Sequence, residues 1–168
     1  MLADITLVVF PALMAFAAMS DLVTMTISNR VSVLLVCIFA ILAVCLGLSL
    51  TTLAWHVGVA LAVLVVVFGM FSLGWIGGGD AKLAAATALW VGPTLLVEYF
   101  FWASLFGGAL TLAIIFARGT PLPAFALGWG WANRLHDSKS GIPYGIALAS
   151  AGLVVYPATE IWQKAFGG

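Results

Sequence analysis

Long apolar runs follow one another along almost the whole chain, and few charged residues interrupt them. Only 7% of the 168 residues are charged and 64% are hydrophobic, whereas soluble domains carry roughly 25% charged residues. A soluble fold of this size would have too few charged side chains to cover its surface. The composition therefore predicts an all-α, polytopic membrane protein.

The apolar runs are long enough to be read as about six membrane-spanning helices. A bilayer core of about 30 Å needs roughly 20 apolar residues in each helix. The first run carries Asp4 and lacks the positive n-region of a signal peptide, so we expect it to be retained as a helix. No linker divides the chain, which predicts one integral-membrane domain over residues 1–168. The predicted spans lie near residues 3–20, 31–50, 53–74, 80–97, 98–117 and 142–160.

The Lys and Arg residues predict how the chain is oriented in the membrane. Basic residues concentrate in cytoplasmic loops, and this rule favours an N-terminus on the outside. In that orientation only Lys164 lies outside. It also brings Asp21, at the end of the first span, and Asp80, at the start of the fourth, to the same depth on the cytoplasmic side. The basic residues on that side are Arg30, Lys82, Arg118, Arg134 and Lys139.

Asp21 and Asp80 each have an ordinary explanation when they are taken singly. Asp80 follows a glycine break and could cap the helix after it, and Asp21 could be a loop acid, with Ser28 or Asn29 capping the second span. As a pair they suggest chemistry, because carboxyl groups at membrane depth are costly and two close ones tend to share a proton. Such a dyad activates a water and protonates the leaving amine in aspartic proteases.

The residues around Asp80 favour a site that admits an extended chain. Residues 77–79 are glycines, and without Cβ atoms their backbone can be approached closely by a partner helix or a substrate. The fourth span is also short, because Gly92 and Pro93 interrupt it after about twelve residues, or about 18 Å. A short helix thins the bilayer or draws the site inward.

Three motifs, in the same order along the chain, resemble those of the prepilin peptidases, a family of GxGD intramembrane aspartic proteases. The stretch "GGGDAKLAAATALWVG" is similar to their extended G-x-G-D motif, and "SDLVTMTISN" to their D-x-x-x-x-x-I-P-N segment. A third stretch, "SGIPYGIALASAGL", resembles the Pro-aromatic-Gly segment at the start of their last span. The matched positions are Gly77, Gly79, Asp80 and Lys82; Asp21, Ile27 and Asn29; and Pro143, Tyr144 and Gly145.

The resemblance implies that Asp21 and Asp80 are the catalytic pair of an aspartic endopeptidase that uses no cofactor and no metal. The family removes the short basic leader from type IV prepilins and pseudopilins at the cytoplasmic face of the bacterial inner membrane. The expected partners are such a substrate, with its hydrophobic N-terminal helix, and the lipid bilayer. With a net charge of zero, the chain shows no basic patch for nucleic acid.

The chain departs from the family pattern at two places. Ser28 stands where the family usually has proline, and Ser still suits a helix start. The chain also lacks the insert with paired CxxC motifs that the longer, methylating members carry. By resemblance it is a short, peptidase-only form like those that serve Flp (Tad) pili, and N-methyltransferase activity is not expected.

Other readings remain open from the sequence. The two aspartates could bind a proton or cation in a small transporter, although no internal repeat supports this, or the chain could be a non-catalytic scaffold for pilus assembly. Lys82 could anchor the chain to lipid headgroups, tune the pKa of the aspartate pair or contact the substrate. In the long loop 118–141, "WGWANRL" could be an interfacial helix or contact the substrate leader. His56 and His136 are expected to have no catalytic role.

Overall fold

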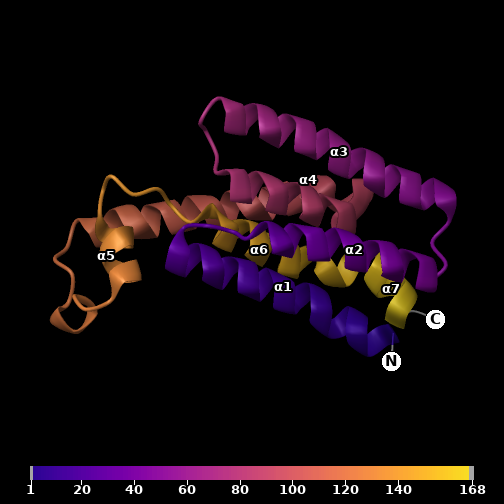
Figure 1. Cartoon of the computed structure of the whole chain (residues 1–168), viewed down its shortest axis with the longest axis horizontal. Helices are drawn as coiled ribbons and strands as arrows, with labels where there is room; N and C mark the ends of the chain where they lie inside the picture. The colour runs from indigo at the N-terminus through magenta and orange to yellow at the C-terminus, as the bar shows by residue number, and fades with distance from the viewer. Residues whose placement is uncertain (1, 167–168) are drawn as a thin grey trace.

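The computed structural model describes residues 2–166, and this part of the chain folds into helices joined by short loops, with no strand. The long helices lie side by side, with both chain ends at one end of the bundle (Figure 1). This arrangement confirms the predicted all-α class. The helices are α1 (Leu2–Thr24), α2 (Asn29–Cys45), α3 (Leu50–Ser72), α4 (Gly78–Arg118), α5 (Gly130–His136), α6 (Tyr144–Val155) and α7 (Glu160–Phe166), with 3₁₀ turns η1 (Ala124–Ala126) and η2 (Tyr156–Ala158).

Within residues 2–166, the helices α1, α3 and α4 are long and apolar enough to cross a membrane. The chain from α6 through α7 makes a fourth such segment if its bend of 44° is counted as part of one span. The helix α2 is apolar but has only 17 residues. The lengths therefore fit a polytopic protein, while α2 is shorter than its predicted span and α4 is much longer.

The helix α4 reverses direction at Gly92, where the backbone adopts φ 70° and ψ −176°. Its two limbs, residues 78–91 and 93–118, pack against each other, since Ala84 and Phe100 belong to one apolar cluster and Asp80 and Ser104 line one groove. In a straight helix the latter pair would lie about 36 Å apart. The predicted boundary between residues 97 and 98 is wrong, and the interruption that Gly92 and Pro93 predicted is where the chain turns.

The first limb of α4 forms the centre of the bundle. All its residues from 83 to 91 are buried, and α2, α3 and α6 each pack against α4. Alanines at positions 84–86 and 88 leave room for these neighbours, because small side chains let membrane helices approach closely. The limb thus holds Asp80, at its start, against the rest of the molecule.

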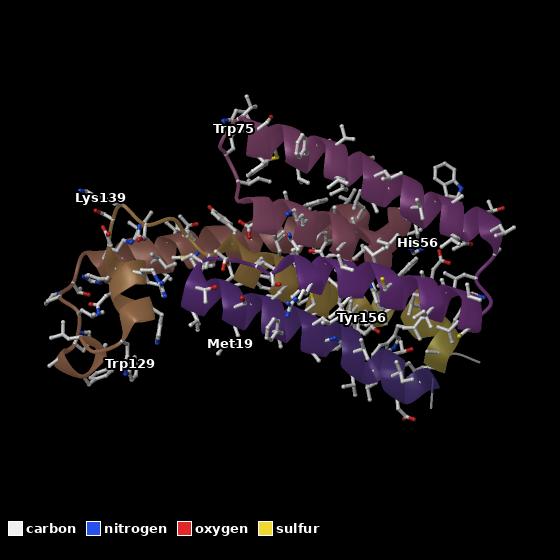
Figure 2. All side chains as sticks on the ribbon, viewed as in Figure 1. Met19, His56, Trp75, Trp129, Lys139 and Tyr156 are labelled. Carbon is white, nitrogen blue, oxygen red and sulfur yellow. The ribbon has the colours of Figure 1, made fainter. Side chains whose placement is uncertain are left out.

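Large aromatic side chains fill the core at the end that carries both termini, which we call the terminal end. Phe10 stacks on Tyr156 with ring centroids 4.3 Å apart, and Tyr156 also packs edge-on against Trp90. The Trp90 indole N–H donates to the Leu35 carbonyl at 3.0 Å, and the Tyr156 hydroxyl donates to the Thr6 carbonyl at 2.5 Å. Tyr156 and His56 are labelled at this end in Figure 2.

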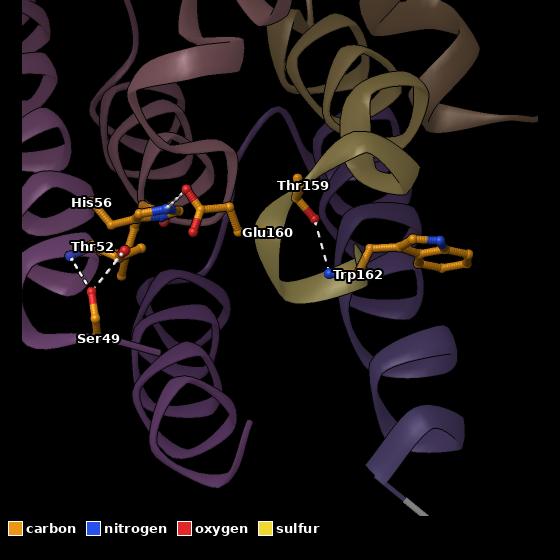
Figure 3. A network of polar contacts seen from close by, with 7 residues as sticks. Ser49, Thr52, His56, Thr159, Glu160 and Trp162 are labelled. Atoms are coloured by element: carbon orange, nitrogen blue, oxygen red, sulfur yellow. Dashed lines mark hydrogen bonds and ion pairs between the residues drawn. The ribbon is translucent and has the colours of Figure 1, made fainter. Parts of the chain in front are cut away.

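His56 is buried at the terminal end and has two partners, although the sequence indicated none. Its Nδ1 lies 2.7 Å from the Leu89 carbonyl oxygen, and its Nε2 lies 3.7 Å from Glu160 Oε1 (Figure 3). A Cβ on Gly92 would lie 2.6 Å from the imidazole Cε1, so the ring packs directly on the reversal of α4. His56 therefore joins α3, the α4 reversal and α7.

Candidate active site

The opposite end of the bundle, which we call the aspartate end, collects the residues of all three sequence motifs. The helix α1 ends there and α2, α4 and α6 begin there (Figure 1). Asp21 lies in the last turns of α1 and is only 4% exposed. Its Oδ2 accepts a hydrogen bond of 2.7 Å from the Gly145 N–H at the start of α6. The interpretation of Asp21 as a loop acid is therefore wrong.

Asp80 is the third residue of α4, and Gly77 occupies the N-cap position, so Asp80 is not the cap itself. Its carboxyl group instead reaches back to the backbone N–H of Gly77, as the third residue does in a capping box. The other oxygen, Oδ1, is buried and has no hydrogen-bond partner. Asp80 also lies close enough to Asp21 for their charges to interact.

Ile27 fits between the starts of α4 and α6, and two glycines make room for it. A Cβ on Gly79 would lie 3.1 Å from the Ile27 Cβ. A Cβ on Gly145 would lie 2.6 Å from the Ile27 Cδ1 and 2.7 Å from Asp21 Oδ2. A Cβ at Gly145 would force Asp21 or Ile27 to move, and one at Gly79 would crowd Ile27, so glycine lets the two helix starts lie close together. At these two glycines the side chains of Ile27 and Asp21 thus pack directly against the backbone of α4 and α6.

The remaining motif residues support the helix starts. Pro143 is buried directly before α6, and the Tyr144 hydroxyl lies 3.1 Å from Thr111 Oγ1 on the second limb of α4. Ser28 caps α2, as predicted, by accepting a 3.3 Å bond from the Arg30 N–H.

Lys82 lies near the site in sequence but on the other side of the first limb of α4. Its Nζ donates to Asn29 Oδ1 at 2.7 Å. Asp80 lines a groove with α3 and α6, whereas Lys82 and Asn29 line a different groove with α2. The bond ties α4 to α2, a link that the motif spacing did not indicate.

Two arginines hold the loop 118–141 against the aspartate end, and the sequence analysis assigned them only to membrane orientation. Arg118 donates to the carbonyls of Leu135 and Ser140 at 2.7 and 3.0 Å. Arg134 donates to the carbonyl of Val23 in α1. The predicted short helix within this loop is present as α5. Their partners are backbone carbonyls, which leave no pattern in the sequence.

An apolar groove of about 630 Å³ runs from Asp80 along α3, the second limb of α4 and α6. Apart from Asp80, its polar lining is limited to Ser104 and Tyr144. Val66 on its rim is 62% exposed, so the groove is open toward the outside of the bundle. Among residues 2–166, no group of three or more His, Cys, Asp or Glu side chains is placed to hold a metal ion. The site can therefore offer the Asp80 carboxyl group at an apolar, laterally open surface, with Asp21 close enough behind it to interact electrostatically.

A comparison with known protein families matches the segment that contains both aspartates. The model of the type IV leader peptidase family matches residues 8–112, which include Asp21, Asp80 and the first two motifs. No curated protein and no solved structure gives a significant match. Because the matched segment makes up more than half of the chain, the protein belongs to the type IV leader peptidase family.

Proposed function

We propose that this chain is an intramembrane aspartic endopeptidase that removes the leader from type IV prepilins or pseudopilins. Its family implies an aspartic-type peptidase in general. The observation that supports the catalytic assignment is the closeness of Asp21 and Asp80, from two different helices, at the place where Asp80 lines an apolar groove. Both carboxyl groups are held by backbone N–H groups, so they are oriented without a cation between them.

In the proposed reaction the two carboxyl groups share one proton. The ionised one takes a proton from a water molecule, and the water oxygen adds to the peptide carbonyl carbon. The protonated one donates to the carbonyl oxygen, and a proton then passes to the leaving nitrogen as the C–N bond breaks. Asp80 Oδ1, which has no protein partner, is suited to hold the water.

The groove supports a substrate whose cleavage site adjoins an apolar helix. The apolar part of that helix would lie along Val67, Leu96 and Phe100, and the peptide bond to be cut would reach Asp80. Gly77, the exposed N-cap residue of α4, would let the extended substrate backbone pass close to the start of this helix. The basic leader would then project beyond the aspartate end, and a short Flp-type pilin is the substrate that fits the short form of this chain.

The proposed location is the bacterial inner membrane, with the N-terminus outside and the aspartate end in the cytoplasm. Arg30, Lys82 and Arg118 lie at the aspartate end, together with the two basic residues of the loop 118–141, whereas Lys164 lies in α7 at the terminal end. Basic residues concentrate on the cytoplasmic side of membrane proteins. The aspartates would then meet the prepilin leader on the side where it is synthesised.

The test is leader cleavage in bacterial membranes that contain this chain and a candidate Flp-type prepilin, followed by gel shift and N-terminal sequencing. We expect Asp21→Asn and Asp80→Asn each to slow cleavage by at least about a thousandfold. Asp137→Asn is the matched control, because Asp137 lies in the loop at the same end and bonds only locally to the Lys139 N–H. Cleavage that survives either Asn variant at matched protein levels would overturn the dyad. Proton- or cation-coupled flux without cleavage would favour a transporter instead.

A further inference from the structure

A second groove, of about 590 Å³, lies on the opposite side of the first limb of α4. It separates α2 from α3, which both pack on α4 but make little contact with each other. Its volume falls within the range of about 300–1,000 Å³ that is typical of ligand sites. The proposed peptidase reaction makes no use of it.

The polar groups of this groove are confined to one end. Asn29, Ser32 and Lys82 line its mouth at the aspartate end, and everything along its length toward the terminal end is apolar apart from Cys37. No acidic residue lines it. The bond to Asn29 occupies one of the three N–H donors of Lys82. The Ser32 hydroxyl is buried without a hydrogen-bond partner, and such a group is usually satisfied by a ligand or water.

We infer that this groove binds an anionic phospholipid, with one acyl chain between α2 and α3 and the phosphate at Lys82. The lysine supplies charge and hydrogen bonds to the phosphate, and Ser32 donates to an ester oxygen below it. The apolar length of the groove matches a hydrocarbon chain, and the single positive mouth matches a negative headgroup at the membrane surface. A second copy of the chain is a poorer occupant, since an apolar helix would leave Lys82 and Ser32 unsatisfied.

Such a lipid would touch the same limb that carries Asp80, from its other side. Lys82 follows Asp80 by two positions, so a bound phosphate would fix the start of α4 through Lys82 and Asn29. The site would therefore be a binding site for membrane lipid that is separate from the peptide groove.

The experiment is a lipid titration of the purified, full-length protein in a zwitterionic detergent, read by native mass spectrometry. Phosphatidylglycerol and phosphatidylcholine with identical acyl chains are the probes. We expect phosphatidylglycerol to bind about fivefold more tightly than phosphatidylcholine, because one lysine near an anionic lipid contributes about this much. Lys82→Gln should abolish this preference, whereas Lys139→Gln, which removes a positive charge from the loop 118–141, should keep it.

Two exposed positions on α3 provide a matched test of the groove itself. Leu61 lines the lipid groove and Val66 lines the peptide groove, and they are 56% and 62% exposed, so a tryptophan can replace either without entering the core. Leu61→Trp should weaken the binding of both lipids, and Val66→Trp should weaken the binding of neither. Equal binding of the two lipids to the unaltered protein would overturn the inference, as would a preference that survives Lys82→Gln. A lipid-independent dimer that Leu61→Trp dissociates would assign the groove to a second copy. Peptide cleavage is not measured, so the outcome is independent of the proposed peptidase activity.

Discussion

At the terminal end, three large polar side chains in the core are each bonded to a backbone carbonyl, whereas at the aspartate end α4 and α6 begin without side-chain caps. Trp90, Tyr156 and His56 bond to carbonyls of other helices and lock the bundle together. The starts of α4 and α6, at Gly77 and Pro143, have no side-chain cap. Their neighbouring N–H groups are instead directed at the two aspartates.

This difference in hydrogen bonding suggests that the terminal end stabilises the bundle and that the aspartate end serves the proposed reaction. Satisfied polar groups within aromatic packing stabilise one arrangement of the helices. Helix starts without side-chain caps and an unpartnered carboxyl oxygen, Asp80 Oδ1, leave hydrogen-bonding capacity that the proposed substrate and water would use. We therefore expect substitutions at the terminal end to lower stability and substitutions at the aspartate end to lower the cleavage rate.

Trp90→Ala should have the largest effect on stability. The side chain is fully buried, packs against Phe10 and Phe39, and donates to the Leu35 carbonyl. Its removal should lower the free energy of unfolding by about 3–5 kcal/mol, measured by denaturant titration in detergent with circular dichroism. A loss below about 1 kcal/mol would show that the aromatic core does not hold the bundle together.

Gly92→Ala should rank second, because the new Cβ would lie 2.6 Å from the His56 ring and the residue has φ 70°. Strain and overpacking together should cost about 3 kcal/mol of unfolding free energy. Gly108→Ala, in the second limb of α4, is the control, since nothing lies within 4 Å of its Cβ position. For Gly92→Ala, the cleavage rate per folded molecule should stay near that of the unaltered protein. A loss of cleavage rate without a loss of stability would contradict the assignment of stability to the terminal end.

Gly145→Ala meets an equally close contact at the aspartate end, where the new Cβ would lie 2.7 Å from Asp21 Oδ2. Displacement of Asp21 should slow leader cleavage about a hundredfold, measured as initial rates at matched membrane levels. Gly141→Ala, which has open space at its Cβ position, should cleave normally. If Gly145→Ala lowered the free energy of unfolding as much as Gly92→Ala and left the cleavage rate unchanged, the two ends would not differ in their roles.

Tyr156→Phe should have the smallest effect, because it removes only the hydrogen bond to the Thr6 carbonyl. Hydrogen bonds between membrane helices contribute about 0.6 kcal/mol on average and at most about 1.7 kcal/mol. Tyr144→Phe removes the corresponding bond to Thr111 at the aspartate end. Unfolding and cleavage should be measured for both variants. We expect Tyr156→Phe to lower the free energy of unfolding without slowing cleavage. We expect Tyr144→Phe to slow cleavage.

The sequence predicted what depends on composition and local pattern. The apolar runs predicted the helices, and the charge distribution predicted that Asp21 and Asp80 share one end of the bundle, as they do. The reversal of α4 was placed five residues late, because apolar side chains continue across it and only a glycine permits its backbone angles. The hydrogen bonds between Asp21 and Gly145 and between Lys82 and Asn29 join distant segments, as does the 3.7 Å approach of His56 to Glu160. No local pattern records such contacts, so they required the structure.

The reversal at Gly92 also decides where this protein can carry a reporter. The two limbs of α4 meet without a loop, and Val91 and Gly92 are buried, so an epitope tag or a protease site inserted there would split the bundle. The segment from Gly119 to Pro123 is largely exposed. We therefore expect topology mapping by insertion to succeed in residues 119–123 and to fail at Gly92. Because no loop separates the two limbs, we expect them to enter the membrane as a pair during synthesis.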